Sequence, residues 1–199
     1  ALGGEMARNT DATAIQFRML NQSKGPAVWS PRAQCDKLLY QRRMKHVVES
    51  EKQIFLHQAE VVSVLREGDR IAGVVTHFDE RFYAKAVVIC TGTFLRGLLH
   101  YGMKQVPGGR AGDAPANELS VSLLEDLDLT IGRLKTGTPP RVMAKSLDFA
   151  EMEEQPSDPN GRFCHWPEAV KGFTSLAPDP MPQRSCYMVR STLATRDLV

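Results

Sequence analysis

The sequence predicts an α/β fold in which a small antiparallel meander interrupts a parallel sheet. Apolar residues recur every three or four positions between Cys35 and Val48, which is the spacing of an amphipathic helix. Short β-rich runs joined by polar turns occupy residues 53–90, as in an antiparallel meander. The last run, Ala86–Cys90, is continuously apolar, which is typical of a strand buried on both faces of a parallel sheet.

Each element has its own sequence signal. Ser30-Pro31 predicts a helix N-cap followed by proline at the first helical position, and the helix should end near Ser50. A second helix is predicted over Asn117–Leu129, because leucines recur there on one face. The meander strands are predicted at 53–57, 61–65, 70–78 and 82–90, and an exposed acidic connector at 148–158.

Composition excludes several classes of protein. The 199 residues suffice for one domain or one and a half, and 42% hydrophobic with 24% charged residues is typical of a folded chain. No apolar run approaches the ~20 residues needed to span a bilayer, so we expect no membrane protein. We expect no signal peptide, and the scattered cysteines favour a reduced, cytoplasmic protein.

The net charge of +2 conceals an uneven distribution. Residues 18–45 hold seven Lys/Arg and one acid, a difference of +6, and residues 131–145 hold four Lys/Arg and no acid. Residues 146–158 hold five acids and no base. The two basic blocks suit a polyanion such as a nucleic acid or cofactor phosphates, and an ordinary solvated surface is the alternative.

Two short segments carry candidate chemistry. The turn Thr91-Gly92-Thr93 ends the apolar run, and its glycine would let the backbone approach a cofactor phosphate or ring closely. A simple strand-ending turn is the alternative, and the meander before it favours flavin binding. Cys186 follows a loop-like segment beside Arg184 and Arg190, and nearby cations favour the nucleophilic thiolate. Cys35 and Cys90 are better explained as small apolar residues.

The run Gly132-Arg-Leu-Lys-Thr-Gly-Thr-Pro-Pro-Arg141 combines basic side chains with hydroxyl groups and a stiff backbone, which suits phosphate binding. This run closely resembles the signature of the MnmG family, also called GidA, of flavoproteins that modify wobble uridines of tRNA. Further blocks resemble the family in the same order, namely 11–18, 20–21, 23–28, 32–34, 84–88, 92–95 and 108–113. The resemblance runs from Ala1 to about Val199.

The resemblance implies a two-dinucleotide-binding-domain flavoprotein, with an FAD/NAD(P)-binding Rossmann-like fold. Residues 1–130 would form the middle of a discontinuous FAD-binding domain that includes the meander at 53–90. Residues 131–199 would form the incomplete beginning of an inserted domain for substrate or NADH. We expect this chain to be an internal segment of a much longer enzyme, which alone binds FAD weakly or not at all.

The resemblance also implies site residues. FAD would be held near Val61, near the turn Thr91, Gly92 and Thr93, and near Ala116, where the family has a serine. Cys186 matches the second of two cysteines important for activity, although the residues around it depart from the family pattern. Contacts to tRNA phosphates are expected from the basic residues, for which our candidates are Lys24, Arg32, Arg110, Arg133, Lys135 and Arg141.

The family's activity is the addition of a carboxymethylaminomethyl group to carbon 5 of wobble uridine. It uses FAD, with NADH and methylene-tetrahydrofolate as co-substrates, together with the GTPase MnmE, and the full protein is expected to be a homodimer. No metal is implied. Two other functions stay open at this point: an RNA-binding segment without activity of its own, and a related folate-dependent tRNA uracil methyltransferase.

Overall fold

The computed structural model describes residues 4–137, 142–159, 161–163 and 181–194. The chain forms two compact units, one from residues 1–55 with 140–199 and the other from residues 56–139. This division does not coincide with the predicted boundary at residue 130, because the two ends of the chain pack together. The assignment of a cofactor domain and an inserted domain to the sequence stays a prediction.

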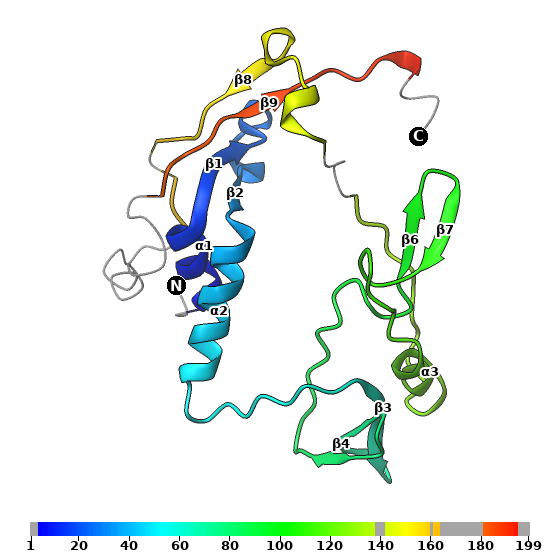
Figure 1. Cartoon of the computed structure of the whole chain (residues 1–199). Coiled ribbons are helices and arrows are strands. Elements are labelled where there is room, and N and C mark those ends of the chain that lie inside the picture. Colours follow the sequence, from blue (N-terminus) through cyan, green and yellow to red (C-terminus); the bar gives the residue numbers. More distant parts are fainter. Residues whose placement is uncertain (1–3, 138–141, 160, 164–180, 195–199) are drawn as a thin grey trace. The chain divides into compact units, whose positions relative to one another are not determined.

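The first unit begins with a helix that leads directly into a β-hairpin (Figure 1). Helix α1 (Glu5–Thr13) precedes β1 (Ala14–Leu20), which pairs antiparallel with β2 (Ser30–Cys35). Short 3-10 turns at Gln22–Lys24 and Pro26–Val28 connect the two strands. Helix α2 (Lys37–Ser50) follows β2 after one residue.

Residues from the other end of the chain line the second edge of β1. The Phe17 amide donates to Ser157 Oγ at 2.9 Å, and the Phe17 carbonyl accepts from the Asp158 amide at 2.9 Å. The Arg184 amide donates to the Ile15 carbonyl at 2.7 Å. The first of these segments follows β8 (Glu153–Gln155), and Arg184 precedes β9 (Cys186–Met188). Strands β8 and β9 form a two-stranded antiparallel ribbon. Further 3-10 turns precede β8, at Ala144–Ser146 and Phe149–Glu151.

The start predicted at Ser30-Pro31 for the helix now seen as α2 is wrong, and its predicted end near Ser50 is confirmed. Ser30 and Pro31 lie in β2, where Ser30 is paired with Leu20 and Pro31 with Met19. The helix begins after Asp36, whose carboxylate accepts from the amides of Leu38 and Leu39 at 3.0 Å each. A carboxylate at this position satisfies amides that lack a partner in the first helical turn.

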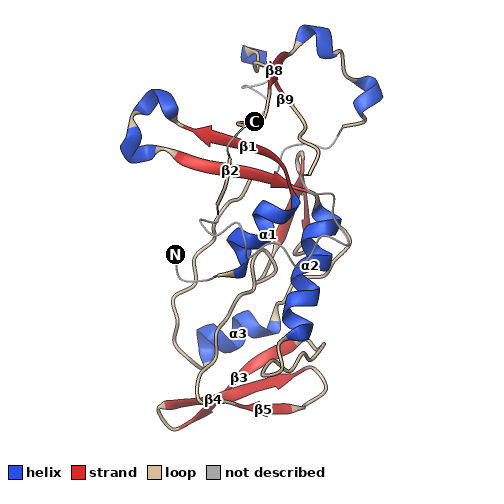
Figure 2. Ribbon diagram, turned by 90° about the vertical axis from the view of Figure 1, so that its left-hand side faces the viewer, coloured by secondary structure: helices blue, strands red, loops and turns tan. Residues whose placement is uncertain are grey.

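The second unit is built on a three-stranded meander. Strands β3 (Val61–Glu67), β4 (Arg70–Thr76) and β5 (Arg81–Tyr83) pair antiparallel in that order. Helix α3 (Glu118–Glu125) packs on β3 (Figure 2). Val64, Leu119 and Leu123 form the buried core, with Val61, Leu95, Leu127 and Ile131 against it. A separate hairpin consists of β6 (Leu98–Tyr101) and β7 (Lys104–Pro107).

Several predicted elements of the second unit differ from the structure. Residues 53–57 form no strand, and the strand predicted over 82–90 ends at Tyr83. Ala86–Cys90 is irregular and exposed, with Val88 at 83%, so the prediction of a buried parallel strand is wrong for this chain. The described residues offer no parallel strand for it to pair with, and an unpaired strand has nothing to fix its backbone amides.

Two further predictions need correction. The helix predicted over Asn117–Leu129 is shorter, at Glu118–Glu125, although Leu119 and Leu123 are buried as its periodicity predicts. The acidic stretch 148–158 is more than a connector, because Glu153–Gln155 forms β8. Among the described residues, no helix is long and apolar enough to cross a membrane.

Substitution of Leu123 by alanine should lower the free energy of unfolding by about 2–5 kcal/mol, because it opens a cavity in the core beside Val64. Leu124→Ala is the matched control, since this neighbour on the same helix is 36% exposed. Urea unfolding measures both. Equal losses in the two variants would contradict the packing described here.

The acid stability of the first unit should depend on Glu5. Partial burial opposes ionisation, but hydrogen bonds and charges from Arg8 and Arg43 outweigh it, and the pKa of Glu5 lies below its ordinary value. The resulting stabilisation is complete above the unfolded-state pKa of about 4.3 and is lost as the pH falls through the lower folded value. Glu5→Gln should therefore be less stable than the wild type at pH 7 and equal to it near pH 2–3.

Denaturant unfolding at the two pH values tests this expectation. Glu51→Gln is the control, because the Glu51 side chain is exposed at the end of α2. A difference between Glu5→Gln and wild type that does not change with pH would show that the carboxylate charge contributes nothing.

Candidate functional site around Cys186

Cys186 is the first residue of β9, where it pairs with Gln155 of β8. Its side chain is half-buried and makes no disulfide. The amide of Arg184 is hydrogen-bonded to β1, two residues before the cysteine. The backbone on both sides of the sulfur is therefore attached to a strand, which restricts where the side chain can point.

Two glutamines contact the sulfur. Gln16, on β1, is 2% exposed, and its Oε1 accepts from Cys186 Sγ at 2.9 Å. Gln34, on β2, donates through Nε2 to Cys186 Sγ at 2.8 Å and to Gln16 Oε1 at 3.0 Å. The three side chains thus form a closed triangle of polar contacts from three strands.

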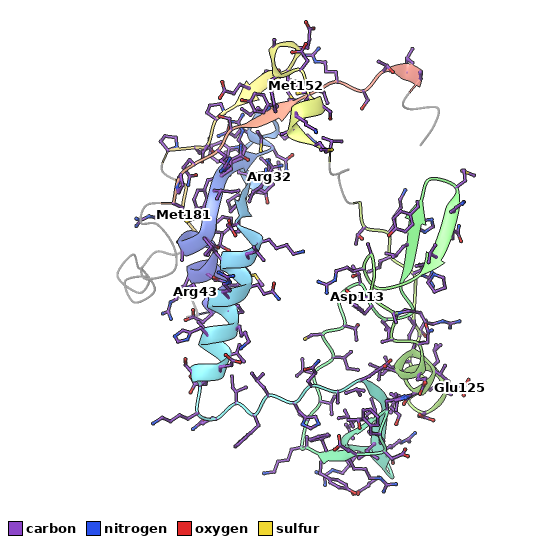
Figure 3. All side chains as sticks on the ribbon, in the orientation of Figure 1. Arg32, Arg43, Asp113, Glu125, Met152 and Met181 are labelled. Carbon is purple, nitrogen blue, oxygen red and sulfur yellow. The ribbon has the colours of Figure 1, made fainter. Side chains whose placement is uncertain are left out.

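A cation also reaches this cluster. Arg32, labelled on β2 in Figure 3, places Nη2 3.5 Å from Gln16 Oε1. The sequence points instead to Arg184 and Arg190 as the neighbouring cations, and both residues are exposed. The Gln34 amide that donates to the sulfur and the strands on either side of it hold the thiol in a fixed direction, which suits nucleophilic chemistry.

Sequence reasoning missed Gln16, Gln34 and Gln155 as parts of the site. Gln34 and Gln16 are 18 residues apart, and Gln16 and Cys186 are 170 apart. Nothing in the local pattern of any of these residues shows that they meet. A glutamine in a strand between apolar neighbours is the available signal, and it indicates a buried polar group without naming its partner.

The other described cysteines have different surroundings. Burial raises the pKa of the Cys35 thiol, although hydrogen bonds with Thr13 and Thr10 oppose this effect. Cys90 is exposed, so the prediction that it is a small buried apolar residue is wrong, and Cys164 lies outside the described residues. Within the described part of the chain, no group of three His, Cys, Asp or Glu residues could hold a metal ion.

The candidate cofactor turn lies in the second unit. The Phe94 amide donates to the Thr91 carbonyl at 3.0 Å, which closes the turn predicted at Thr91-Gly92-Thr93. Gly92 has φ +56 with open space where a Cβ would lie, so its backbone is accessible. Thr93 Oγ1 donates to the Gly109 carbonyl at 2.6 Å and joins the turn to the glycine-rich segment.

The structure brings Ala116 to this turn. Its amide donates to the Phe94 carbonyl at 2.9 Å, and its carbonyl accepts from the Arg96 amide at 3.0 Å. Val61 begins β3, an edge strand of the meander, and packs against the same core cluster as Leu95. The second unit therefore supplies one turn, one neighbouring segment and one strand edge as candidate cofactor contacts.

The predicted nucleic-acid contacts fall into both units. Lys24 and Arg32 are exposed in the first unit. In the second, Arg110 is paired with Asp113, Arg133 Nη1 donates to the Arg96 carbonyl at 3.3 Å, and Lys135 is exposed. Asp113 is labelled in Figure 3. Arg141 lies outside the described residues.

Comparison with known proteins now gives the class of this chain. The model of the family described as "Glucose inhibited division protein A" matches residues 1–198. Proteins named "tRNA uridine 5-carboxymethylaminomethyl modification enzyme MnmG" are similar over the whole chain, with 47% identity in Protochlamydia amoebophila and 46% in Geobacter sulfurreducens. The chain belongs to the glucose-inhibited division protein A family, GidA. It spans about 30% of the length of each of these two relatives.

Solved structures agree with this assignment. Two crystal forms of Aquifex aeolicus GidA match with TM-scores of 0.77 and 0.78, at 38% and 41% identity. Each match covers 94% of this chain and 31% or 30% of the Aquifex chain. The predicted family and the mixed α/β fold class are confirmed.

The thiols should differ in reactivity in the order of their exposure. At pH 8 iodoacetamide should modify Cys90 faster than Cys35, because burial hinders access to Cys35 and disfavours its thiolate. Peptide mass spectrometry of timed samples gives the rate at each site. Faster labelling of Cys35 in the folded chain would contradict its described surroundings.

Proposed function

We propose that this chain is part of an FAD-dependent enzyme that adds a carboxymethylaminomethyl group to carbon 5 of the tRNA wobble uridine. The observation that carries the proposal is the Cys186 thiol held by Gln16 and Gln34, in a chain matched from end to end by relatives named for this modification. The predicted cytoplasmic location belongs to the same proposal.

Cys186 acts as the nucleophile on the uracil ring. Its thiolate adds to carbon 6, and the electron pair of the ring's 5,6 double bond moves toward the carbonyl at carbon 4, which makes carbon 5 nucleophilic. After carbon 5 has formed its new bond to a one-carbon electrophile, it loses its proton. The sulfur–carbon bond then breaks and restores the double bond and the thiolate.

The residues of the second unit fit a flavin held by backbone groups. Gly92 leaves open space beside its backbone, and β3, which begins with Val61, leaves half of its backbone groups outside the meander. Thr91, Thr93 and Ala116 would complete the contact. The serine-to-alanine difference at Ala116 removes a side-chain contact and keeps the backbone. When bound, FAD supplies the redox chemistry, with NADH as reductant and methylene-tetrahydrofolate as carbon donor.

The tRNA would be attracted by exposed basic residues in each unit. Lys24 and Arg32 are the candidates in the first unit, and Arg133 and Lys135 in the second. Arg110 already has a carboxylate partner in Asp113, so tRNA phosphate would have to compete with it. Such contacts give salt-dependent affinity without sequence preference. The GTPase MnmE as partner and a homodimer complete the proposal.

Replacement of Cys186 by alanine in the full-length protein should lower wobble modification by at least about 100-fold, because it removes the nucleophile. Mass spectrometry of nucleosides from digested tRNA measures the product. Cys90→Ala is the matched control, since this cysteine is exposed and lies in the other unit. Undiminished modification by the Cys186→Ala protein would overturn the proposed role of the sulfur.

A further inference from the structure

The orientation of the Gln16 side chain is fixed by a backbone carbonyl. Gln16 Nε2 donates to the Gln155 carbonyl at 3.0 Å, so Oε1 faces Cys186. The reverse orientation would set Oε1 against the Gln155 oxygen and deprive this half-buried carbonyl of the Gln16 donor, which is costly. Since Gln16 is 2% exposed, water does not replace these contacts.

The orientation of Gln34 follows from that of Gln16. Its Nε2 carries two hydrogens, and the two contacts use both, one to Gln16 Oε1 and one to the sulfur. A reversed Gln34 would place two carbonyl oxygens against each other. The Gln155 carbonyl therefore orients both amides, and it presents an acceptor and a donor to the same sulfur atom.

These two contacts respond to the proton on sulfur in opposite ways. The Gln34 N–H bond becomes charge-assisted when the sulfur is a thiolate, and such bonds are the stronger class. The Gln16 oxygen accepts the S–H of the neutral thiol, and it faces a second negative atom once that proton has left. One amide thus favours the charged form and the other the neutral form.

We propose that Gln34 and Gln16 are opposed positioning residues for Cys186: Gln34 stabilises and aims the thiolate, and Gln16 holds the proton of the resting thiol. This inference deepens the proposed function, on which its role in catalysis rests. Neither glutamine contacts the uracil ring in this scheme. They act through the sulfur, whose proton passes to solvent when the thiolate forms.

The neighbouring elements also carry charged residues. They are Arg32 on β2, Arg184 beside Cys186, and Glu153 and Glu154 on β8. Glu154 is engaged by the Ser185 hydroxyl at 2.6 Å. All of these groups stay in place when a glutamine is replaced, so a comparison of glutamine variants isolates the amide contacts.

The experiment follows iodoacetamide alkylation of Cys186 in the full-length protein, by peptide mass spectrometry from pH 5 to 10 and without tRNA. Gln34→Leu should slow the reaction at pH 7 by about tenfold, because the thiolate loses the hydrogen bond from Nε2. Gln34→Glu should slow it further, because a carboxylate oxygen repels the thiolate. Gln16→Leu should accelerate it by about threefold, and Gln41→Leu, exposed on α2, should change nothing.

A purely structural role would expose the sulfur and accelerate alkylation in all the cluster variants, and that result would overturn the proposal. If Gln16→Leu does not fold, the other two variants decide. The alkylation rate of Cys186 should fall from wild type to Gln34→Leu and again to Gln34→Glu, and any other order overturns the proposal. Because no tRNA or cofactor is present, the result is separate from wobble modification. If the Cys186→Ala protein kept full wobble modification, the proposed function of the sulfur would be overturned, and the order of alkylation rates would be unaffected.

Discussion

The first unit depends on the hydrogen bonds along the second edge of β1. The segments that make them, around Asp158 and Arg184, lie about 140 and 170 residues away in sequence, so their closure costs chain entropy. As a result, backbone groups of β1 are hydrogen-bonded along both of its edges. The backbone bonds at Phe17 and Ile15, together with the bond from the Gln16 side-chain amide to the Gln155 carbonyl, hold β8, β9 and Cys186 beside β1.

The two units bury different kinds of side chain. The second unit buries Val64, Leu119 and Leu123 between the meander and its helix, next to Ser122, whose hydroxyl accepts from the Val64 amide. The first unit buries a large share of polar groups, among them Gln16, Asn9 and Thr13. Buried polar groups must find partners with defined geometry, and they therefore specify position more strictly than apolar contacts do. This strictness suits a region that has to direct one sulfur atom.

Local pattern was sufficient for some elements and insufficient for others. The end of α2 near Ser50 and the strands β3 and β4 follow from periodicity and turn residues, which act over a few positions. Ser30-Pro31 led to a wrong prediction because proline also suits the edge strand β2, and the cap is Asp36, six residues after Ser30. Cys186 could be proposed from its neighbours and its resemblance, whereas the glutamines around it meet through contacts that no local window contains.

The irregular run Ala86–Cys90 has a practical consequence for work with the isolated 199-residue chain. It combines β-branched residues with high exposure, 83% for Val88 and 42% for Ile89, and it carries no charge. Such a segment is a template for intermolecular strand pairing. This run should therefore contribute to self-association of the chain, and a charged residue at Val88 should reduce that contribution.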